Sequence, residues 1–387
     1  MLLQKTIKAK VYKPTNTKLF LLTKEYEEFQ RELRNSPSHL YSATKQQAQR
    51  FKKRLGKRLK RNKEYPLILR NDSYRVKIQD TKLVKAWIKI PVCDVWGGIW
   101  LPVKVPDYQI PLLELTLKEG KLIKRGDDWF VHIVVQKEIE VGSPDPNRIL
   151  SIDLGERVVA TSVAIVDDQM KHIGFHGREI RGIRRHYAWL RKRLGERKLL
   201  KVIKRVGHKE QRKVGDVLHK VSHEVVELAD QFSLTIVLGD LEGIRNRSRG
   251  RKMNRIVSNM PYYKLTQMIT YKAGWRGIPV VKLSEAYTSK TCHLCGERGT
   301  RPHQGLFKCQ TCELEYNADL NGAINIAKRF REQVLLERGS IDRALNSGES
   351  EATRGRIYPQ RIPSTSNGGK VNRSIPSSQF FSTNPKI

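Results

Sequence analysis

Two CxxC pairs constrain the fold of this chain more than any other feature. Cys292 and Cys295 form the first pair, and Cys309 and Cys312 form the second. A CxxC turn directs two sulfur atoms toward one ion, and a hairpin between the pairs can complete the tetrahedral ligand set of a structural zinc site. The fifth cysteine, Cys93, stands alone. Two disulfides are the alternative, but the chain opens without the apolar core of a signal peptide, so we predict one structural zinc ion.

The chain also carries a large excess of positive charge. It has 74 Lys and Arg against 39 Asp and Glu, which gives a formal net charge of +35. An excess of this size attracts polyanions by counterion release, whereas a thermophile-type charged surface keeps both signs in closer balance. No apolar run approaches the roughly 20 residues that a membrane span needs. We therefore expect no membrane partner and a cytoplasmic, nucleoid-associated protein that binds nucleic acid.

The first part of the chain combines strand-like and helix-like patterns. Residues 3–12 alternate like an edge strand, and residues 16–62 have helical spacing that ends in a basic run. Residues 65–140 are rich in Val, Ile, Leu and Trp with Gly and Pro between them, which is typical of antiparallel strands. We predict a small barrel or curled sheet in this region, followed by a linker at residues 140–146.

The remainder alternates buried strands with helices, which favours an α/β fold. Strand patterns lie at 149–166, 233–245 and 278–289, and helical patterns lie at 176–232 and 261–276. Between His176 and Lys220 sixteen Lys and Arg face only four Asp and Glu, a composition suited to a phosphate backbone. From about residue 332 the sequence turns to Ser, Pro, Asn, Gly and Arg, and we predict a disordered tail.

One carboxylate, Asp153, ends an otherwise apolar strand in the segment SIDLG. A buried carboxylate without a partner is costly, so Asp153 needs a metal ion, a cation or strong hydrogen bonds. Gly155 permits a close backbone approach beside it. The competing interpretation is a hydrogen-bonded Asp at the end of a strand.

A second carboxylate, Asp319, opens a predicted helix in the segment YNADLNGAINIAKR. Its apolar residues recur at helical spacing and form one buried stripe, Leu320, Ala323, Ile324 and Ala327. Asp319 lies beside that stripe in the first turn, where it can point at a sheet, and Asn317 is a candidate cap. Alternatively, Asp319 only favours the helix dipole.

These segments resemble, in order, the motifs of the TnpB family. The matching segments are SIDLGERVVAT, HKVSHEVVELA at 219–229, GDLEGIR, AYTSKTCHLCG, the second CxxC and YNADLNGAINIAKR. TnpB proteins are transposon-encoded RNA-guided nucleases with a RuvC (RNase H-like) domain, related to type V CRISPR effectors and to Fanzor proteins. The resemblance is strong over residues 148–330 and weak over residues 1–145.

The resemblance implies an α/β protein whose RuvC-like nuclease domain contains an inserted zinc ribbon and follows a β-barrel wedge domain with an inserted helical domain. It further implies a guide RNA from the transposon end, target DNA and two catalytic Mg²⁺ ions, and we expect a monomer. The corresponding boundaries are 1–14 and 63–145 for the wedge domain, 15–62 for the helical domain, 146–286 and 316–331 for the nuclease domain, 287–315 for the ribbon and 332–387 for the disordered tail.

The family's middle acid does not map directly onto this chain. The first and third acids correspond to Asp153 and Asp319, but Gly239 stands where the family has a glutamate. In VVKLSEAY, period two places Glu285 at the end of the next strand, where it can reach the same metal site. We favour Glu285 as the replacement.

Two other interpretations of the middle acid remain open. Asp240 or Glu242 could supply the ligand locally, although alternation along the strand turns Asp240 away from the direction of Gly239. The other is loss of cleavage, which would leave a nuclease-dead RNA-guided DNA-binding protein. A transposase or accessory protein of an insertion sequence is a further alternative. The preferred hypothesis is a Mg²⁺-dependent DNA endonuclease, with Asp153, Glu285 and Asp319 as metal ligands.

Overall fold

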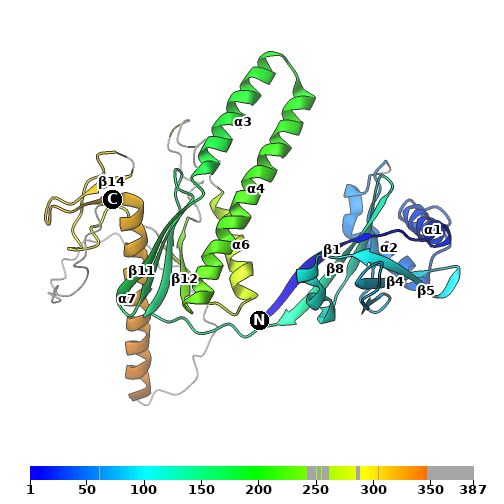
Figure 1. Cartoon of the computed structure of the whole chain (residues 1–387), viewed down its shortest axis with the longest axis horizontal. Helices are drawn as coiled ribbons and strands as arrows, with labels where there is room; N and C mark the ends of the chain where they lie inside the picture. The colour runs from blue at the N-terminus through cyan, green and yellow to red at the C-terminus, as the bar shows by residue number, and fades with distance from the viewer. Residues whose placement is uncertain are drawn as a thin grey trace. The chain divides into compact units, whose positions relative to one another are not determined.

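A computed structural model describes residues 1–60, 62–241, 250, 254, 261–284, 288–303 and 305–346, with side chains through residue 337. The chain divides into two compact units, Met1–Ile139 and the part that begins at Glu140 (Figure 1). Within the described ranges, no helix combines the length and the apolar character that crossing a membrane requires.

The N-terminal unit is built on one eight-stranded antiparallel sheet. The strands pair in the order β2-β7-β8-β1-β5-β4-β3, and β6 pairs with β8. Their bounds are Leu2–Val11 (β1), Leu67–Leu69 (β2), Arg75–Ile78 (β3), Ala86–Val92 (β4), Val95–Lys104 (β5), Thr116–Leu117 (β6), Gly120–Arg125 (β7) and Asp128–Glu138 (β8). The order of paired strands has two ends in the described part of the chain, so the sheet is open and not a closed barrel.

The first strand occupies an interior position in that sheet. β1 pairs with β8 along almost its whole length and with β5 at its end, so the expectation of an edge strand at residues 3–12 is wrong. Its alternating pattern instead reflects two different faces. Ile7, Ala9 and Val11 are buried in the core, and the residues between them point toward solvent.

Two helices cover part of this unit's core. They are α1 (Asn16–Leu33) and α2 (Ser42–Leu55), followed by the 3₁₀ turn η1 (Gly56–Arg58); a second, η2, spans Asp107–Glu114. Thr15 caps α1 by accepting a hydrogen bond from the Lys18 N–H. Tyr26 of α1 packs edge-on against Trp129 of β8, with ring centroids 5.1 Å apart. Trp129 is therefore a core residue, which agrees with its position in a half-buried strand.

The C-terminal unit contains a mixed five-stranded sheet in the order β11-β10-β9-β12-β13. The strands β9, β10 and β11 form an antiparallel meander, and β12 and β13 continue the sheet parallel to β9. Their bounds are Arg148–Asp153 (β9), Ala160–Val166 (β10), Gln169–His176 (β11), Thr235–Asp240 (β12) and Val280–Ser284 (β13). The helices are α3 (Glu179–Glu196), α4 (Leu200–Gln231), α6 (Tyr262–Gly274) and α7 (Ala318–Asn346).

Helices cover both faces of this sheet. Leu150 and Ile152 of β9 pack with α4 and α6 in one apolar cluster, whereas Ile149 packs with α7 in another. Burial on both faces explains why the sequence of β9 is an unbroken apolar run. Alternate residues of β9 therefore face different helices. Odd-numbered residues of β9, including Asp153 at its end, face α7.

The segment between β13 and α7 carries a short two-stranded sheet, β14 (Leu306–Lys308) with β15 (Glu315–Asn317). β15 leads directly into α7, and this helix continues to Asn346. The prediction of a disordered tail from residue 332 is therefore wrong for residues 332–346, because the stretch REQVLLER is rich in strong helix formers and extends the helix. The residues beyond 346 lie outside the described part of the chain.

Candidate functional site

Asp153 lies at the end of β9, on the face of the sheet that α7 covers. Its carboxylate lies against the backbone of Gly322 in α7. A Cβ atom added at Gly322 would come within 2.9 Å of Asp153 Oδ2. Burial, followed by the negative charge of Asp319, raises the pKa of Asp153 to about 7. This carboxyl group is therefore held where its charge needs a nearby cation.

Asp319 enters the same site from the first turn of α7. Asn317 Oδ1 accepts hydrogen bonds from the N–H groups of Asp319 and Leu320, both at 3.0 Å, which confirms Asn317 as the helix cap. Burial raises the pKa of Asp319, and the guanidinium groups of Arg301 and Arg157 act in the opposite direction. The structure thus brings the two predicted acids together.

Two arginines line this pair of acids, and the sequence alone did not reveal them. Arg301 Nη2 lies 3.6 Å from Asp319 Oδ1, and its charge also lowers the pKa of Asp153. Arg157, in the turn after β9, acts on Asp319. Their signal in the sequence is weak because the chain contains so many basic residues. They give the site positive charge beside its carboxylates.

Gly322 is the third feature that sequence analysis missed. Glycine inside a helix is unfavourable relative to alanine by roughly 0.5–1 kcal/mol, so its presence in the buried part of α7 indicates a close approach. The close approach is that of the Asp153 carboxylate. A signal was available in the run NGAIN, where a glycine lies inside a segment of helical periodicity.

The position of the middle acid is determined only in part. Gly239 is buried in β12 and follows Val237, which packs in the α7 cluster, so Gly239 faces the same side as Asp153. Asp240 is exposed. Strand alternation places it on the same side of the sheet as Leu238, which packs with α4 and α6. This arrangement weighs against Asp240 as a ligand.

The two glutamates proposed for the middle acid, Glu285 and Glu242, lie outside the described residues. In β13, Leu283 packs in the α7 cluster and pairs in register with Gly239. Leu283 therefore points to the side of the sheet that carries the acid pair. Ser284, the last described residue of β13, points to the opposite side by strand alternation. The assignment of Glu285 stays a prediction.

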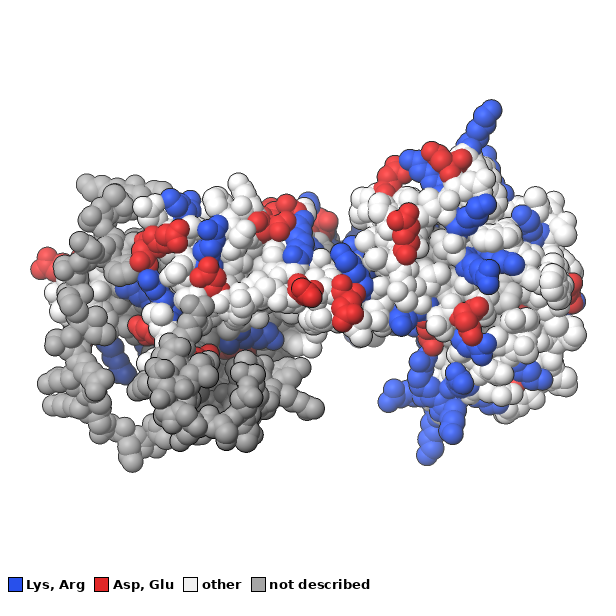
Figure 2. Space-filling view, turned by 90° about the horizontal axis from the view of Figure 1, so that it is seen from below, with Lys and Arg blue, Asp and Glu red and all other residues white. Residues whose placement is uncertain are grey.

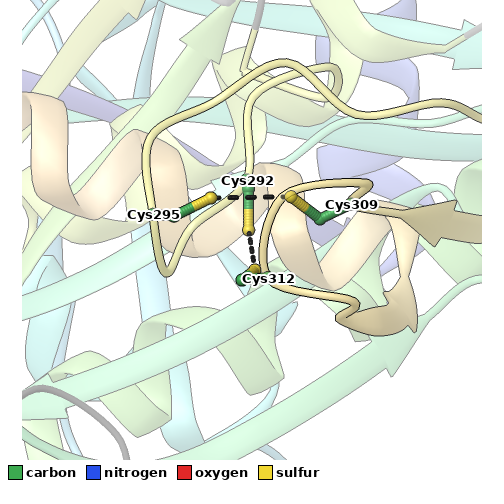
Figure 3. A group of neighbouring side chains, drawn as sticks. All are labelled: Cys292, Cys295, Cys309 and Cys312. Atoms are coloured by element: carbon green, nitrogen blue, oxygen red, sulfur yellow. Dashed lines mark hydrogen bonds between the residues drawn. The ribbon is translucent and has the colours of Figure 1, made fainter.

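The four cysteines of the two CxxC pairs converge (Figure 3). The Cys292 and Cys312 sulfurs lie 3.6 Å apart, and those of Cys295 and Cys309 lie 3.5 Å apart. Tetrahedral coordination with Zn–S bonds of about 2.3 Å places sulfurs about 3.8 Å apart, so the donor set fits a zinc ion. None of the four forms a disulfide.

The local backbone prepares the cysteines for metal binding. Backbone N–H groups of Cys312 and Thr311 lower the pKa of Cys309 to about 6, whereas burial raises that of Cys292. The Cys309 N–H donates to the Leu314 carbonyl, which closes the second CxxC turn. At least one thiolate is therefore favoured before a cation arrives.

One face of α7 fastens the first CxxC turn to the helix that carries Asp319. Asn321 is fully buried; its Nδ2 donates to the Thr291 carbonyl at 2.8 Å, and its Oδ1 accepts the His293 N–H at 3.0 Å. One turn later Asn325 Nδ2 also donates to Thr291, and Lys328 donates to the His293 carbonyl. These bonds hold the backbone on both sides of Cys292. The cysteine cluster and the acid pair therefore share one rigid element.

The helices α3 and α4 form a long hairpin (Figure 1). Exposed cations follow both helices, among them Lys192, Arg193, Lys201, Lys204 and Arg212. Arg193 also lies over the ring of Trp189, 4.8 Å from its centroid. In the N-terminal unit, Figure 2 shows a projecting cluster of Lys and Arg on the visible face. Both units thus present surfaces suited to phosphate.

Parts of this chain are similar in sequence to known proteins. A family model described as Cas12f1-like, TNB domain, matches residues 262–326, from α6 through the cysteine cluster to the first turns of α7. The Cas12f1 CRISPR-associated endodeoxyribonuclease of Sulfoacidibacillus thermotolerans is 31% identical, over 60% of this chain and 56% of its own. A TnpB-like protein of Methanocaldococcus jannaschii is 26% identical, over 60% of this chain and 87% of its own.

The match spans about half the length of the Cas12f relatives. A crystal structure titled as an AacC2c1–sgRNA–extended non-target DNA ternary complex is 9% identical, covers 70% of this chain and 56% of its own, and has a TM-score of 0.49. The TNB-domain match and the TnpB-like and Cas12f relatives thus make the chain similar to the TnpB family, in agreement with the ordered motifs of its sequence.

Proposed function

We propose that this chain is an RNA-guided DNA endonuclease of the RuvC (RNase H-like) type. The observation that carries the proposal is the meeting of Asp153 and Asp319 from separate elements, over a glycine that leaves room for the Asp153 carboxylate. Hard carboxylate oxygens suit Mg²⁺, and two such ions would activate the attacking water and stabilise the leaving oxygen of a phosphodiester. Glu285 is the proposed third ligand.

The residues of the chain have distinct roles in this proposal. Asp153 and Asp319 would hold the cations. Burial raises the pKa of each carboxyl group, and a bound cation would favour its ionised form. Arg301 and Arg157 orient Asp319 and offer guanidinium groups to the phosphate of the DNA strand. The four cysteines hold one structural zinc ion.

We further propose the domain division given by the family resemblance. It assigns 1–14 and 63–145 to a wedge domain, 15–62 to a helical domain, 146–286 and 316–331 to the nuclease domain and 287–315 to the zinc ribbon. The basic hairpin would contact guide RNA and heteroduplex phosphates, while base pairing reads the target sequence. The protein would act as a cytoplasmic monomer.

A second candidate function is an RNA-guided DNA-binding protein that has lost cleavage. The observation in its favour is Gly239, which faces the acid pair and carries no carboxylate. The two proposals agree on guide RNA and target DNA, so only cleavage separates them.

Plasmid cleavage with guide RNA and Mg²⁺ tests the proposal. Wild type should cut the target, and Asp153→Ala and Asp319→Ala should each lower the rate by at least about 10²-fold while target binding is kept. Glu285→Ala should match them, and Asp240→Ala should cut like wild type. Binding without any cleavage in wild type would establish the nuclease-dead alternative. Full cleavage activity of Glu285→Ala would exclude Glu285 as the third ligand.

A further inference from the structure

The N-terminal unit contains a second cluster of metal-binding side chains, remote in sequence from both sites described above. His39 lies in the segment between α1 and α2, and Cys93 and Asp94 form the two-residue turn of the β4–β5 hairpin. One donor atom from each residue lies within 4.8 Å of the other two. The lone cysteine of the sequence thus has a histidine and a carboxylate beside it.

The individual distances suit a small, borderline-soft cation. Cys93 Sγ lies 3.0 Å from His39 Nε2, and the same ring nitrogen lies 3.8 Å from Asp94 Oδ1. For zinc bonds of about 2.0–2.3 Å in tetrahedral geometry, donor atoms are about 3.3–3.6 Å apart. The observed distances lie on either side of that value, so small side-chain rotations are enough to bring the three donors around one ion.

A competing cation is already present at the edge of the cluster. Lys24 Nζ lies 2.7 Å from Asp94 Oδ2. The other oxygen of this carboxylate, Oδ1, is the one that lies near His39. Asp94 can therefore keep its ion pair with Lys24 through one oxygen and offer the other to a metal ion.

Two buried glutamates fix the backbone of both ligand-bearing segments. Glu25 is only 3% exposed and accepts the N–H of Cys93 at 2.9 Å and that of Tyr41 at 3.3 Å. Glu28 accepts the N–H of His39 at 2.8 Å. These carboxylates orient the segments that carry His39 and Cys93. Together with Asp94 they also concentrate negative charge in a chain whose net charge is +35.

We propose that His39 Nε2, Cys93 Sγ and Asp94 Oδ1 form a second zinc-type site, with water in the fourth position. The combination of imidazole, thiolate and carboxylate favours Zn²⁺ over Mg²⁺, because Mg²⁺ prefers oxygen ligands alone. The ion would join the α1–α2 segment to the β4–β5 hairpin. It would tie the helices between β1 and β2 to the sheet that supports them. The site does not depend on nuclease activity.

Zinc stoichiometry of the full-length protein tests the proposal. After loading with Zn²⁺ and dialysis, wild type should retain about two ions per chain, one in the four-cysteine cluster and one here. Cys93→Ser and His39→Asn should each retain about one. His172→Asn, at an exposed position of β11, is the matched control and should retain two. Wild type with a single ion, or Cys93→Ser with two, would overturn the proposal.

A second variant separates a built site from chance binding at a thiol. Lys24→Ala removes the ammonium group beside Asp94, so competition with a zinc chelator should show several-fold tighter binding of the second ion. The four-cysteine cluster supplies an internal reference in the same titration. An unchanged or weaker second affinity in Lys24→Ala would exclude Asp94 as a ligand and overturn the three-residue site.

Discussion

At Asp153, burial, charge and the space beside α7 act together on one carboxyl group. The sheet and α7 bury it, Asp319 adds negative charge, and Gly322 leaves the space that its oxygens occupy. The first two raise its pKa, and the third is purely steric. The space at Gly322 can therefore be altered without changing any charged group in the site.

Replacing that glycine tests the steric contribution. In Gly322→Ala the new methyl group would meet Asp153 Oδ2 at 2.9 Å and its Cγ at 3.2 Å, so the carboxylate has to move. If Asp153 holds a cation as proposed, its displacement misplaces that cation. We therefore expect the target cleavage rate to fall by at least about tenfold, an increase of about 1.4 kcal/mol in the activation barrier. Cleavage kinetics at saturating guide RNA measure this.

A second helical glycine provides the control for stability. Gly207→Ala in α4 adds the same methyl group where no atom lies within 4 Å. It should raise the free energy of unfolding by roughly 0.5–1 kcal/mol through helix propensity alone. Gly322→Ala should lack this gain in urea denaturation. An equal gain in both variants would show that Asp153 does not press on α7.

At the scale of elements, α7 connects the acid pair and the four-cysteine cluster. Its first turn carries Asp319, Gly322 receives Asp153, and Asn321 and Asn325 hold the first CxxC turn. Adjacent residues of the same helix thus serve different sites. Damage to the four-cysteine cluster is therefore expected to reach the acids through α7.

Removing the buried amide of α7 tests that connection. Asn321→Ala removes the acceptor of the His293 N–H and one of the two amide donors to the Thr291 carbonyl, which costs roughly 1–3 kcal/mol. We expect faster extraction of zinc by a chelator and slower target cleavage. Glu332→Ala, exposed on the same helix, should change neither by a measurable amount. Zinc extraction at the wild-type rate in Asn321→Ala would contradict the connection.

Much of this element could be predicted from its sequence, and the reasons are local. The apolar stripe of α7, the Asn317 cap and the strand that ends at Asp153 follow from spacing within a few residues. The contact between Gly322 and Asp153 depends on how a helix packs on a sheet, which periodicity does not specify. The same holds for Arg301 and for the buried carboxylates beside Cys93. The interior position of β1 was missed because alternation reports burial and not pairing partners.

At the scale of the whole molecule, charge is the property that both units share. The net charge of +35 alone would attract any polyanion, so affinity by itself says little about where RNA binds. A specific contact surface can be told apart from this general attraction by the salt dependence of binding. Loss of a cation that contacts phosphate changes the salt dependence of binding more than loss of a distant cation.

The α3–α4 hairpin is the surface on which that difference can be measured. Lys201 and Lys204 are exposed near the start of α4, and Lys77 and Lys82 are exposed in the N-terminal unit. Lys201→Ser with Lys204→Ser should reduce the slope of log affinity against log salt for guide RNA by up to about 1.4, or about 0.7 for each single-strand phosphate contact. Lys77→Ser with Lys82→Ser removes the same net charge and should leave the slope nearly unchanged. Fluorescence anisotropy across a salt series gives both slopes, and equal reductions in the two double variants would mean that the hairpin contributes only its general field.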